Sequence, residues 1–296
     1  MNKGIWYAVG AYFIWGLIPV YIKLLGNIPA PQLLSNRIIW SFVCLLIITL
    51  FTQQFGLFGK AVQDIHVLLI HTTAAFLIGI NWLVYVWAVS ANFIVEASLG
   101  YFINPLLSVL LGVLFLREKL RMWQWVPIGI AAAGVLFIAF AYGKIPWIAL
   151  TLAFTFGFYG MVKKKAVLGS LYGLTLETGI LLLPAILYIS YMESTGKGVV
   201  FNAHTMTIIL LMGAGVITVI PLLMFASAVQ RIPLTFIGIL QYIAPTLQFL
   251  VGILIYNEPF DSGKLIGFGI IWFALIIFGI ESFLHHQAQP VVTDIE

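Results

Sequence analysis

Three ionisable side chains lie within long apolar runs of the sequence, namely Arg37, Glu96 and Glu177. A charge at the middle of a bilayer costs about 2.5 to 3.5 kcal/mol on insertion scales, so such residues usually face a cavity and have a partner. Arg37 shares a helical stripe with Trp40 and Ser41, which we expect to point inward. These residues predict binding of a charged solute or exchange of a proton. The alternative is a buried ion pair that only fixes the helix register.

Glu96 is the candidate for proton coupling, because a carboxyl group in a cavity can exchange a proton when the cavity changes sides. Gly100 and Asn104 follow it at helical spacing. This stripe is expected to aim the carboxyl group at the solute site. The alternative is that Glu96 pins the start of its helix near the membrane surface, where it stays ionised and solvated.

Two prolines follow polar residues in spans that are far apart in the sequence. Asn104 precedes Pro105, and Gln241 lies four residues before Pro245. A proline lacks the amide hydrogen and disturbs the helical bond to the carbonyl four residues back, which leaves polar backbone groups for a ligand. We expect Pro105 and Pro245 to act as hinges beside a solute site near the membrane midplane. Kinks that only let the helices curve are the alternative.

Aromatic and amide side chains are expected to form the walls of this site. Aromatic faces offer contact area and their polar edges offer hydrogen bonds, which suits a planar or amphipathic solute. Other aromatic residues of a membrane protein are anchors that face lipid or its interface. Besides Arg37 and Glu177, the expected solute-binding residues are Trp15, Asn81, Trp82, Tyr85, Tyr101, Asn104, Gln241 and Tyr242.

Composition predicts the elements that position these residues. Of 296 residues, 62% are hydrophobic and 8% are charged, against about 25% charged in an ordinary soluble domain. The apolar runs are about 20 residues long, which is the length of a membrane-spanning helix. The predicted fold class is therefore all-α, a polytopic membrane protein with ten transmembrane helices, near residues 4–24, 32–52, 67–89, 94–116, 123–141, 146–163, 172–192, 206–228, 234–256 and 264–284.

Basic residues predict how these helices are oriented. With a cytoplasmic N-terminus, nine Lys and Arg residues fall in inside loops, including Lys60 and the run 163–165, and four fall outside, namely Lys23, Lys144, Lys197 and Lys264. Cytoplasmic loops carry an excess of basic residues, so we expect both termini in the cytoplasm and the chain in the cell inner membrane. The net charge of +4 has the same origin, and no nucleic-acid partner is expected.

The sequence also contains an internal repeat. Shifted by 140 residues, the stretch 88–120 falls on 228–260 without a gap, with Pro105 on Pro245. A copy of five helices has an odd number of spans, so the second copy enters the membrane in the opposite sense. We expect inverted five-helix repeats at 1–143 and 144–285, followed by a cytoplasmic tail, 286–296. Exchanging the conformations of the two copies opens a cavity to the other side, which is the basis of alternating access.

The same shift places Arg37 on Glu177. From this equivalence we predict that the two charges face each other across the repeat axis. Reversing either charge is then expected to impair transport more than reversing both.

Seven stretches resemble one known family. They are AYFIWG at 11–16, RIIWS at 37–41, NWLVYVWAV at 81–89, EASLGYFINPL at 96–106, FYGMVKKK at 158–165, PLLMFASA at 221–228 and QYIAPTLQFL at 241–250. They are similar to the drug/metabolite transporter superfamily with EamA-type repeats, and within it to the RarD-like, chloramphenicol-sensitive subgroup. The resemblance implies ten helices with both termini cytoplasmic, in agreement with the charge count. It implies transport but defines no substrate.

These observations predict a secondary transporter that exports or exchanges small organic metabolites or drugs. No cofactor, metal site or enzymatic activity is expected, because Cys44 is the only cysteine and HExxH, GxSxG and Walker-type signals are absent. A passive channel or facilitator is the first alternative, and a membrane-embedded enzyme is the second. The expected partners are the small-molecule substrate and membrane lipid. Small-residue spacings such as Gly129/Ala133 fit either a monomer or a homodimer.

Overall fold

The computed structural model describes residues 3–25, 28–51, 59, 63–90, 94–141, 147–201, 203–255, 266–267, 269–274, 276–278 and 280–281. Within these residues the regular secondary structure is helical and contains no strand. The all-α prediction is therefore confirmed.

The helices follow the predicted spans closely. The first half contains α1 (Lys3–Leu24), α2 (Ala30–Phe51), α4 (Ile65–Ser90), α5 (Ile94–Leu116), the short 3-10 helix η1 (Met122–Gln124) and α6 (Trp125–Ala141). The second half contains α7 (Trp147–Lys165), α8 (Ser170–Ser194), α9 (Thr205–Val229), α10 (Leu234–Leu240) and α11 (Ile243–Leu254), and further helical residues lie within 266–281.

Helix length and composition alone mark five described helices as candidates to cross a membrane. These segments are Lys3–Ile22, Ala30–Phe51, Ile65–Ala88, Ser170–Ser194 and Thr205–Val229. Shorter apolar helices include Gly100–Leu116 and Met122–Phe137. The span expected at 234–256 is interrupted between α10 and α11.

Local sequence explains where individual helices begin and end. Pro233 precedes α10 in an extended conformation, a place where its missing amide hydrogen costs no helical hydrogen bond. At the end of α8, Gly196 has a φ angle of +71°, which a glycine adopts without strain. The amides of Gly196 and Lys197 then bond to the carbonyls of Glu193 and Met192 at 3.1 and 3.0 Å. This pattern satisfies carbonyl groups that the helix end leaves free.

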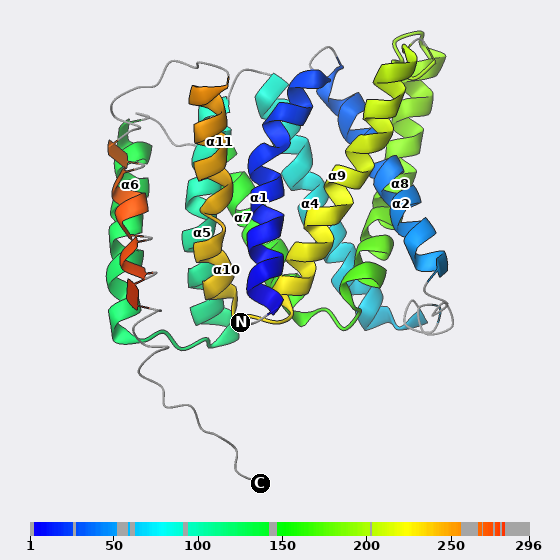
Figure 1. The fold of residues 1–296 in the computed structure, drawn as a ribbon. Helices are drawn as coiled ribbons and strands as arrows, with labels where there is room; N and C mark the ends of the chain where they lie inside the picture. Colours follow the sequence, from blue (N-terminus) through cyan, green and yellow to red (C-terminus); the bar gives the residue numbers. More distant parts are fainter. Residues whose placement is uncertain are drawn as a thin grey trace.

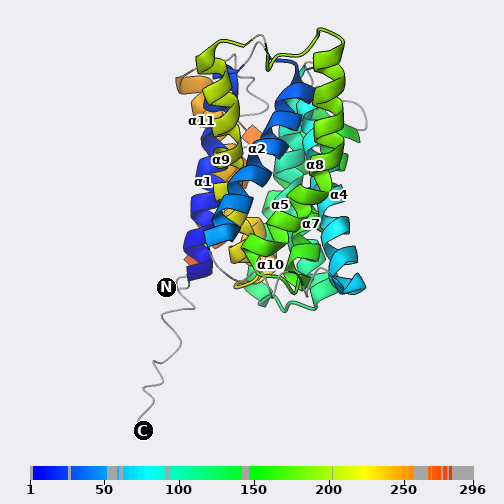
Figure 2. The ribbon, with the colours of Figure 1, turned by 90° about the vertical axis from the view of Figure 1, so that its right-hand side faces the viewer.

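The helices form a bundle with two main layers. α1, α9 and α11 lie in one layer, and α4, α5 and α7 lie in the other (Figures 1 and 2). α2 and α8 pack against each other at one edge, and α6 stands at the opposite edge. Because α1 sits with second-half helices and α7 sits with first-half helices, each layer combines parts of both halves.

Helix contacts recur between the two halves. α1 packs against α9 and α11, and α7 correspondingly packs against α4 and α5. At the first of these contacts Gly16 meets Leu247, and at the second Gly157 meets Leu107. A β-carbon at either glycine would lie 2.6 or 3.0 Å from the facing leucine, so both close approaches need a small residue.

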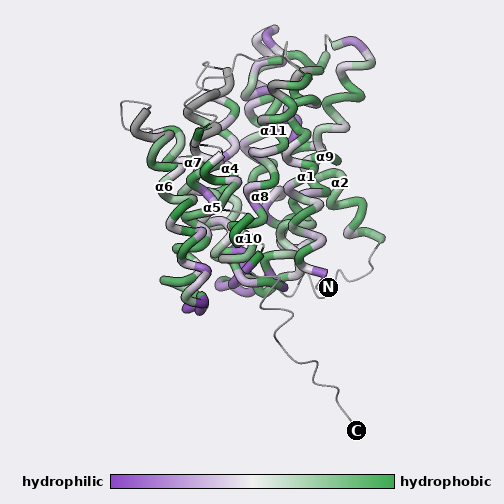
Figure 3. Tube along the Cα trace, turned by 60° about the vertical axis from the view of Figure 1, so that its left-hand side comes forward, coloured by the Kyte–Doolittle hydropathy of each residue, from purple (hydrophilic) through white to green (hydrophobic). Residues whose placement is uncertain are grey.

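The outer surface of the bundle is apolar along its length. Large hydrophobic side chains such as Leu136, Leu183, Leu187 and Ile209 are exposed. Hydrophilic residues gather toward the ends of the helices, as at the connection between α5 and α6 (Figure 3). This distribution is that of a helical bundle surrounded by lipid.

The start of α1 and the connection between α5 and α6 lie at the same end of the bundle (Figure 1). At that end Arg121 forms an ion pair with Glu281 at 2.9 Å. The cytoplasmic location of this end stays a prediction. Lys60, Lys144, Lys264 and the expected tail, 286–296, lie outside the described residues.

Candidate functional site

A cavity of about 730 Å³ lies between the two layers. α1, α9, α11 and Gln241, which lies between α10 and α11, line it from one side, α4, α5 and α7 line it from the other, and α2 contributes Arg37. Its walls are formed by Tyr12, Trp15, Ile18, Arg37, Asn81, Trp82, Tyr85, Tyr101, Phe156, Thr218, Leu222, Gln241, Ala244, Pro245 and Gln248.

Arg37 is the charged residue among these lining residues. Its Nε donates a hydrogen bond to Thr218 Oγ1 at 3.0 Å, and its Cζ lies 5.3 Å from the centre of the Trp82 ring. Within the described part of the chain, no carboxylate pairs with it. A guanidinium has five N–H donors, so Arg37 has donors available for a ligand.

Aromatic rings form a large part of the remaining wall. Tyr85 and Tyr101 meet edge to face with 5.5 Å between ring centres. Across the cavity, the Trp15 ring lies 5.5 Å from Tyr12 and 5.7 Å from Phe156. These rings offer flat apolar area with hydroxyl and indole groups at their edges.

Two polar atoms in the walls are buried without a hydrogen-bond partner in the described structure, namely Tyr12 Oη and Gln241 Oε1. Asn81 differs, since its Nδ2 donates to Leu152 O at 2.9 Å and to Thr155 Oγ1 at 3.0 Å. A buried polar group without a partner costs about 1 to 3 kcal/mol. A ligand that hydrogen-bonds to Tyr12 and Gln241 therefore gains affinity from groups that the fold leaves unsatisfied.

Gln241 lies at the interruption between α10 and α11. Pro245 has no amide hydrogen, so the Gln241 carbonyl cannot accept the usual helical bond and accepts from the Ala244 amide at 3.2 Å. In the first half, α5 continues as one helix through Pro105. Equivalent prolines thus sit in an interrupted helix in one half and in a continuous helix in the other.

Most of the predicted solute-binding residues line this cavity. Seven do so, Trp15, Arg37, Asn81, Trp82, Tyr85, Tyr101 and Gln241, together with the predicted hinge Pro245. The sequence analysis missed Tyr12, Phe156, Thr218 and Leu222. Tyr12 precedes Trp15 by three residues, so helical spacing from Trp15 could have found it.

Comparison with known proteins identifies the family. The chain matches the EamA-like transporter family over residues 2–140. It is 47% identical over 280 residues to the uncharacterized transporter YojE of Bacillus subtilis, covering 94% of this chain and 93% of that protein. The chain belongs to the EamA-like transporter family.

This EamA-family chain is also RarD-like. It is 39% identical over 281 residues to the protein RarD of Escherichia coli, covering 95% of each chain. A solved crystal structure shares 16% identity, covers 94% of this chain and 98% of its own chain, and superposes with a TM-score of 0.69. At that identity the likeness concerns the fold alone.

Asn104 does not line the cavity of this EamA-family protein. It is buried, and its Oδ1 has no partner within the described structure. Gly100, one turn earlier, packs against the α7 backbone, where an added β-carbon would lie 2.8 Å from Ala149 O. The neighbouring Tyr101 is the residue of α5 that reaches the cavity. The side chain of Glu96 lies outside the described part, so its coupling role stays a prediction.

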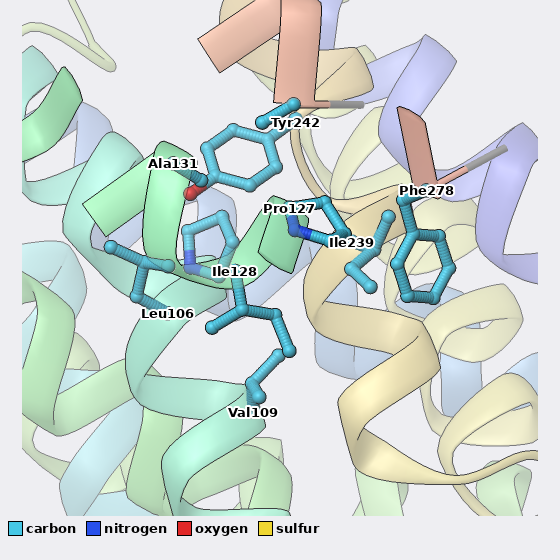
Figure 4. A pocket seen from close by; sticks show the side chains of 10 residues that line it. Leu106, Val109, Pro127, Ile128, Ala131, Ile239, Tyr242 and Phe278 are labelled. Atoms are coloured by element: carbon cyan, nitrogen blue, oxygen red, sulfur yellow. The ribbon is translucent and has the colours of Figure 1, made fainter. Parts of the chain in front are cut away.

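Tyr242 and Pro105 line a second pocket, of about 290 Å³, which is largely apolar (Figure 4). The Tyr242 ring centre lies 6.3 Å from that of Phe102, and its hydroxyl donates to Phe102 O at 3.4 Å. Phe102 and Tyr242 are related by the 140-residue shift, so equivalent residues of the two halves meet here. Tyr242 therefore packs the two halves together and does not form the wall of the larger cavity.

Glu177 lies in a separate buried cluster. Its Oε1 accepts from Lys163 Nζ at 2.7 Å and lies 2.8 Å from His71 Nδ1, while Tyr159 donates to its Oε2 at 3.2 Å. The side chains of Lys163, Glu177 and His71 are 0 to 1% exposed. We expected Lys163 in a loop as a topology signal, and this was wrong, because it neutralises a carboxylate inside the bundle.

The predicted pairing of Arg37 with Glu177 is also wrong. α2 and α8 run antiparallel, with Phe42 beside Gly179 and Thr49 hydrogen-bonded to Thr175. Arg37 and Glu177 each lie seven residues after the start of their helix, which is about 10 Å along the axis from opposite ends. In an antiparallel pair, equivalent residues meet only near the crossing point, and these two lie away from it on opposite sides.

A cluster of aromatic rings lies beside the cavity, toward the end where α1 starts. The Phe225 ring centre lies 5.2 Å from Phe156 and 6.1 Å from Tyr159, and Tyr159 in turn bonds to Glu177. Toward the other end, a smaller pocket of about 270 Å³ shares Arg37 and Thr218 with the cavity. Tyr159 therefore links this ring cluster to the buried Lys163–Glu177–His71 cluster.

Proposed function

We propose that this protein is a secondary transporter that exports or exchanges small organic solutes by alternating access. The observation that carries the proposal is the cavity between the layers, which residues of both halves line. It presents the Arg37 guanidinium, unpaired with any described carboxylate, and two buried polar atoms without partners, Tyr12 Oη and Gln241 Oε1. Such a cavity suits reversible binding of a polar, planar solute.

Inverted five-helix repeats, 1–143 and 144–285, are part of the proposal. They are supported by the contacts of α1 with α9 and α11, which α7 repeats with α4 and α5. The meeting of Phe102 with Tyr242 adds a contact between equivalent residues. In this view the opposite state has an interrupted α5 and a straight α10–α11 segment.

The proposed orientation places both termini in the cytoplasm and the chain in the cell inner membrane, with ten spans. The aromatic layer of Phe156, Tyr159 and Phe225 is then the cytoplasmic gate, and the cavity faces the outside. Glu96 remains the proposed coupling carboxylate. The large exposed hydrophobic side chains fit contact with membrane lipid.

Exchange in proteoliposomes tests the proposed function. The purified protein is reconstituted, and a labelled solute, chosen by thermal stabilisation from a panel of aromatic carboxylates, amino acids and chloramphenicol, is offered against the same solute trapped inside. Counterflow supports a carrier. Conductance without counterflow supports a channel, and chemical conversion of the solute supports an enzyme.

A matched pair of variants relates the exchange to the cavity. Arg37→Gln removes the charge in the cavity, and Lys197→Gln removes an exposed charge on the connection after α8. We expect counterflow to fall at least about tenfold in the first and to remain in the second. Equal counterflow in both variants would place the solute elsewhere.

A further inference from the structure

We infer that the solute of this cavity is an aromatic monocarboxylate that carries no amino group. The inference rests on the proposed function and names the substrate class of the same site. It depends on the charge balance of the cavity, on the chemistry of its walls and on the two buried polar atoms without partners.

The charge balance favours a single negative charge. A guanidinium in an apolar bundle is costly unless an anion pairs with it, and no described carboxylate pairs with Arg37. Arg37 Nε is used by Thr218, which leaves the terminal N–H groups to bind a carboxylate in the two-bond geometry that arginine favours. One guanidinium matches a carboxylate, whereas a phosphate dianion would bring a second charge without a partner.

The same balance disfavours an ammonium group on the solute. Among the described lining residues none is acidic, so the groups that these residues offer to an ammonium are ring faces and amide oxygens. Glu177 cannot serve, because Lys163 and His71 occupy its Oε1 and it lies outside the cavity. An amine would also be repelled by Arg37. We therefore expect a zwitterion to bind more weakly than the matching carboxylate.

The walls favour an aromatic body for the anion. Trp82 lies under the guanidinium of Arg37, and Tyr85 and Tyr101 meet edge to face beside it. A ring attached to the carboxylate can pack against these faces while Trp15 covers it from the other layer. Gln241 Oε1 can accept a hydrogen bond from a ring N–H or O–H group, a contact that no described residue supplies.

Three probes with one ring system test this inference, namely indole-3-acetate, tryptophan and tryptamine. They share the indole N–H but carry a carboxylate alone, both charges, or an ammonium alone. Thermal stabilisation of the full chain in detergent, titrated with each probe, gives apparent dissociation constants. We expect indole-3-acetate to bind at least about tenfold more tightly than tryptophan, and tryptamine to bind most weakly.

Variants at Arg37, with one control variant, test whether this order of affinities arises in the cavity. Arg37→Gln is expected to weaken indole-3-acetate at least about tenfold and to remove its advantage over tryptamine. Lys197→Gln is the control, because that side chain is exposed. If Arg37→Gln does not fold, Arg37→Lys keeps a point charge without the planar fork, and it is expected to lose part of the preference for the carboxylate.

The outcomes separate this inference from the proposed function. Equal or tighter binding of tryptophan or tryptamine overturns the inference, as does the absence of binding by all three probes. If another solute shows counterflow in either case, the transporter proposal stands without the substrate class. If indole-3-acetate binds through Arg37 but shows no counterflow in proteoliposomes, the substrate class stands and the transporter proposal fails.

Discussion

Replacing Lys163 by methionine is expected to destabilise the fold strongly. The substitution keeps the length of the side chain but leaves Glu177 inside the bundle with His71 and Tyr159 as its neighbours. Lys163 is 0% exposed and Glu177 is 1% exposed. Removing one partner of a buried pair typically costs about 3 to 5 kcal/mol, because the other charge stays uncompensated.

The assay is the midpoint of thermal unfolding in detergent. For a chain of this size each kcal/mol moves the midpoint by about 2 to 4 °C, so Lys163→Met is expected to lower it by at least about 6 °C. Lys165→Met is the matched control, because Lys165 is an exposed lysine on the same helix. Its midpoint is expected to change by less than about 2 °C.

A double variant tests the reasoning behind this magnitude. Lys163→Met combined with Glu177→Gln removes both charges, so its cost is expected to be smaller than the sum of the two single costs by at least about 1 kcal/mol. Additive costs, or a loss below about 2 °C for Lys163→Met alone, would refute the view that these two residues stabilise each other as a buried ion pair.

Three further predictions concern substitutions of single residues. Gly16→Ala places a β-carbon 2.6 Å from Leu247 and is expected to lower stability by about 1 to 3 kcal/mol in thermal unfolding, whereas Gly129→Ala, where nothing lies within 4 Å, is expected to be neutral or stabilising. Pro245→Ala restores an amide hydrogen to the interrupted helix, so we expect slower counterflow with an unchanged or raised unfolding midpoint; unchanged counterflow would argue against a hinge. Glu96→Gln is expected to keep solute exchange while uptake loses its dependence on a pH gradient, and retained dependence would leave Glu96 a structural role.

The helices could be predicted because the bilayer imposes length and composition on them. The described helices from α1 to α9 begin and end within two residues of the predicted spans. The interruption at Gln241 could not be predicted from Pro245 alone. Pro105 is the same signal in the first half, and α5 continues through it. A proline permits a break, and the packing around it decides whether the break forms.

The site was harder to predict, because the equivalence of two residues in a repeat does not say how far each lies from the point where their helices cross. Under the shift of 140 residues Phe102 falls on Tyr242, and these two rings meet in the structure. The same shift failed for Arg37 and Glu177, which lie away from the crossing of α2 with α8. In the sequence, Lys163 cannot be distinguished from its neighbours Lys164 and Lys165. It lies beside Glu177 because it is on the face of α7 that points into the bundle. His71 offered no sequence signal beyond its place in an apolar span.

Under the proposed alternating access between two repeats, the interrupted α10–α11 segment also affects the relative populations of the two states. Identical copies could exchange conformations at no cost, but here the break falls at Gln241 in one copy and would fall at Tyr101 in the other. A break at Gln241 and a break at Tyr101 differ in free energy, because one residue is an amide and the other a phenol. This difference contributes to the ratio of the two states in the absence of solute. Both residues line the cavity, so a solute bound there touches the element that sets this ratio. A bound solute must favour one state by about 5.5 kcal/mol to move the ratio from 1:99 to 99:1, and a solute that binds both states equally leaves it unchanged.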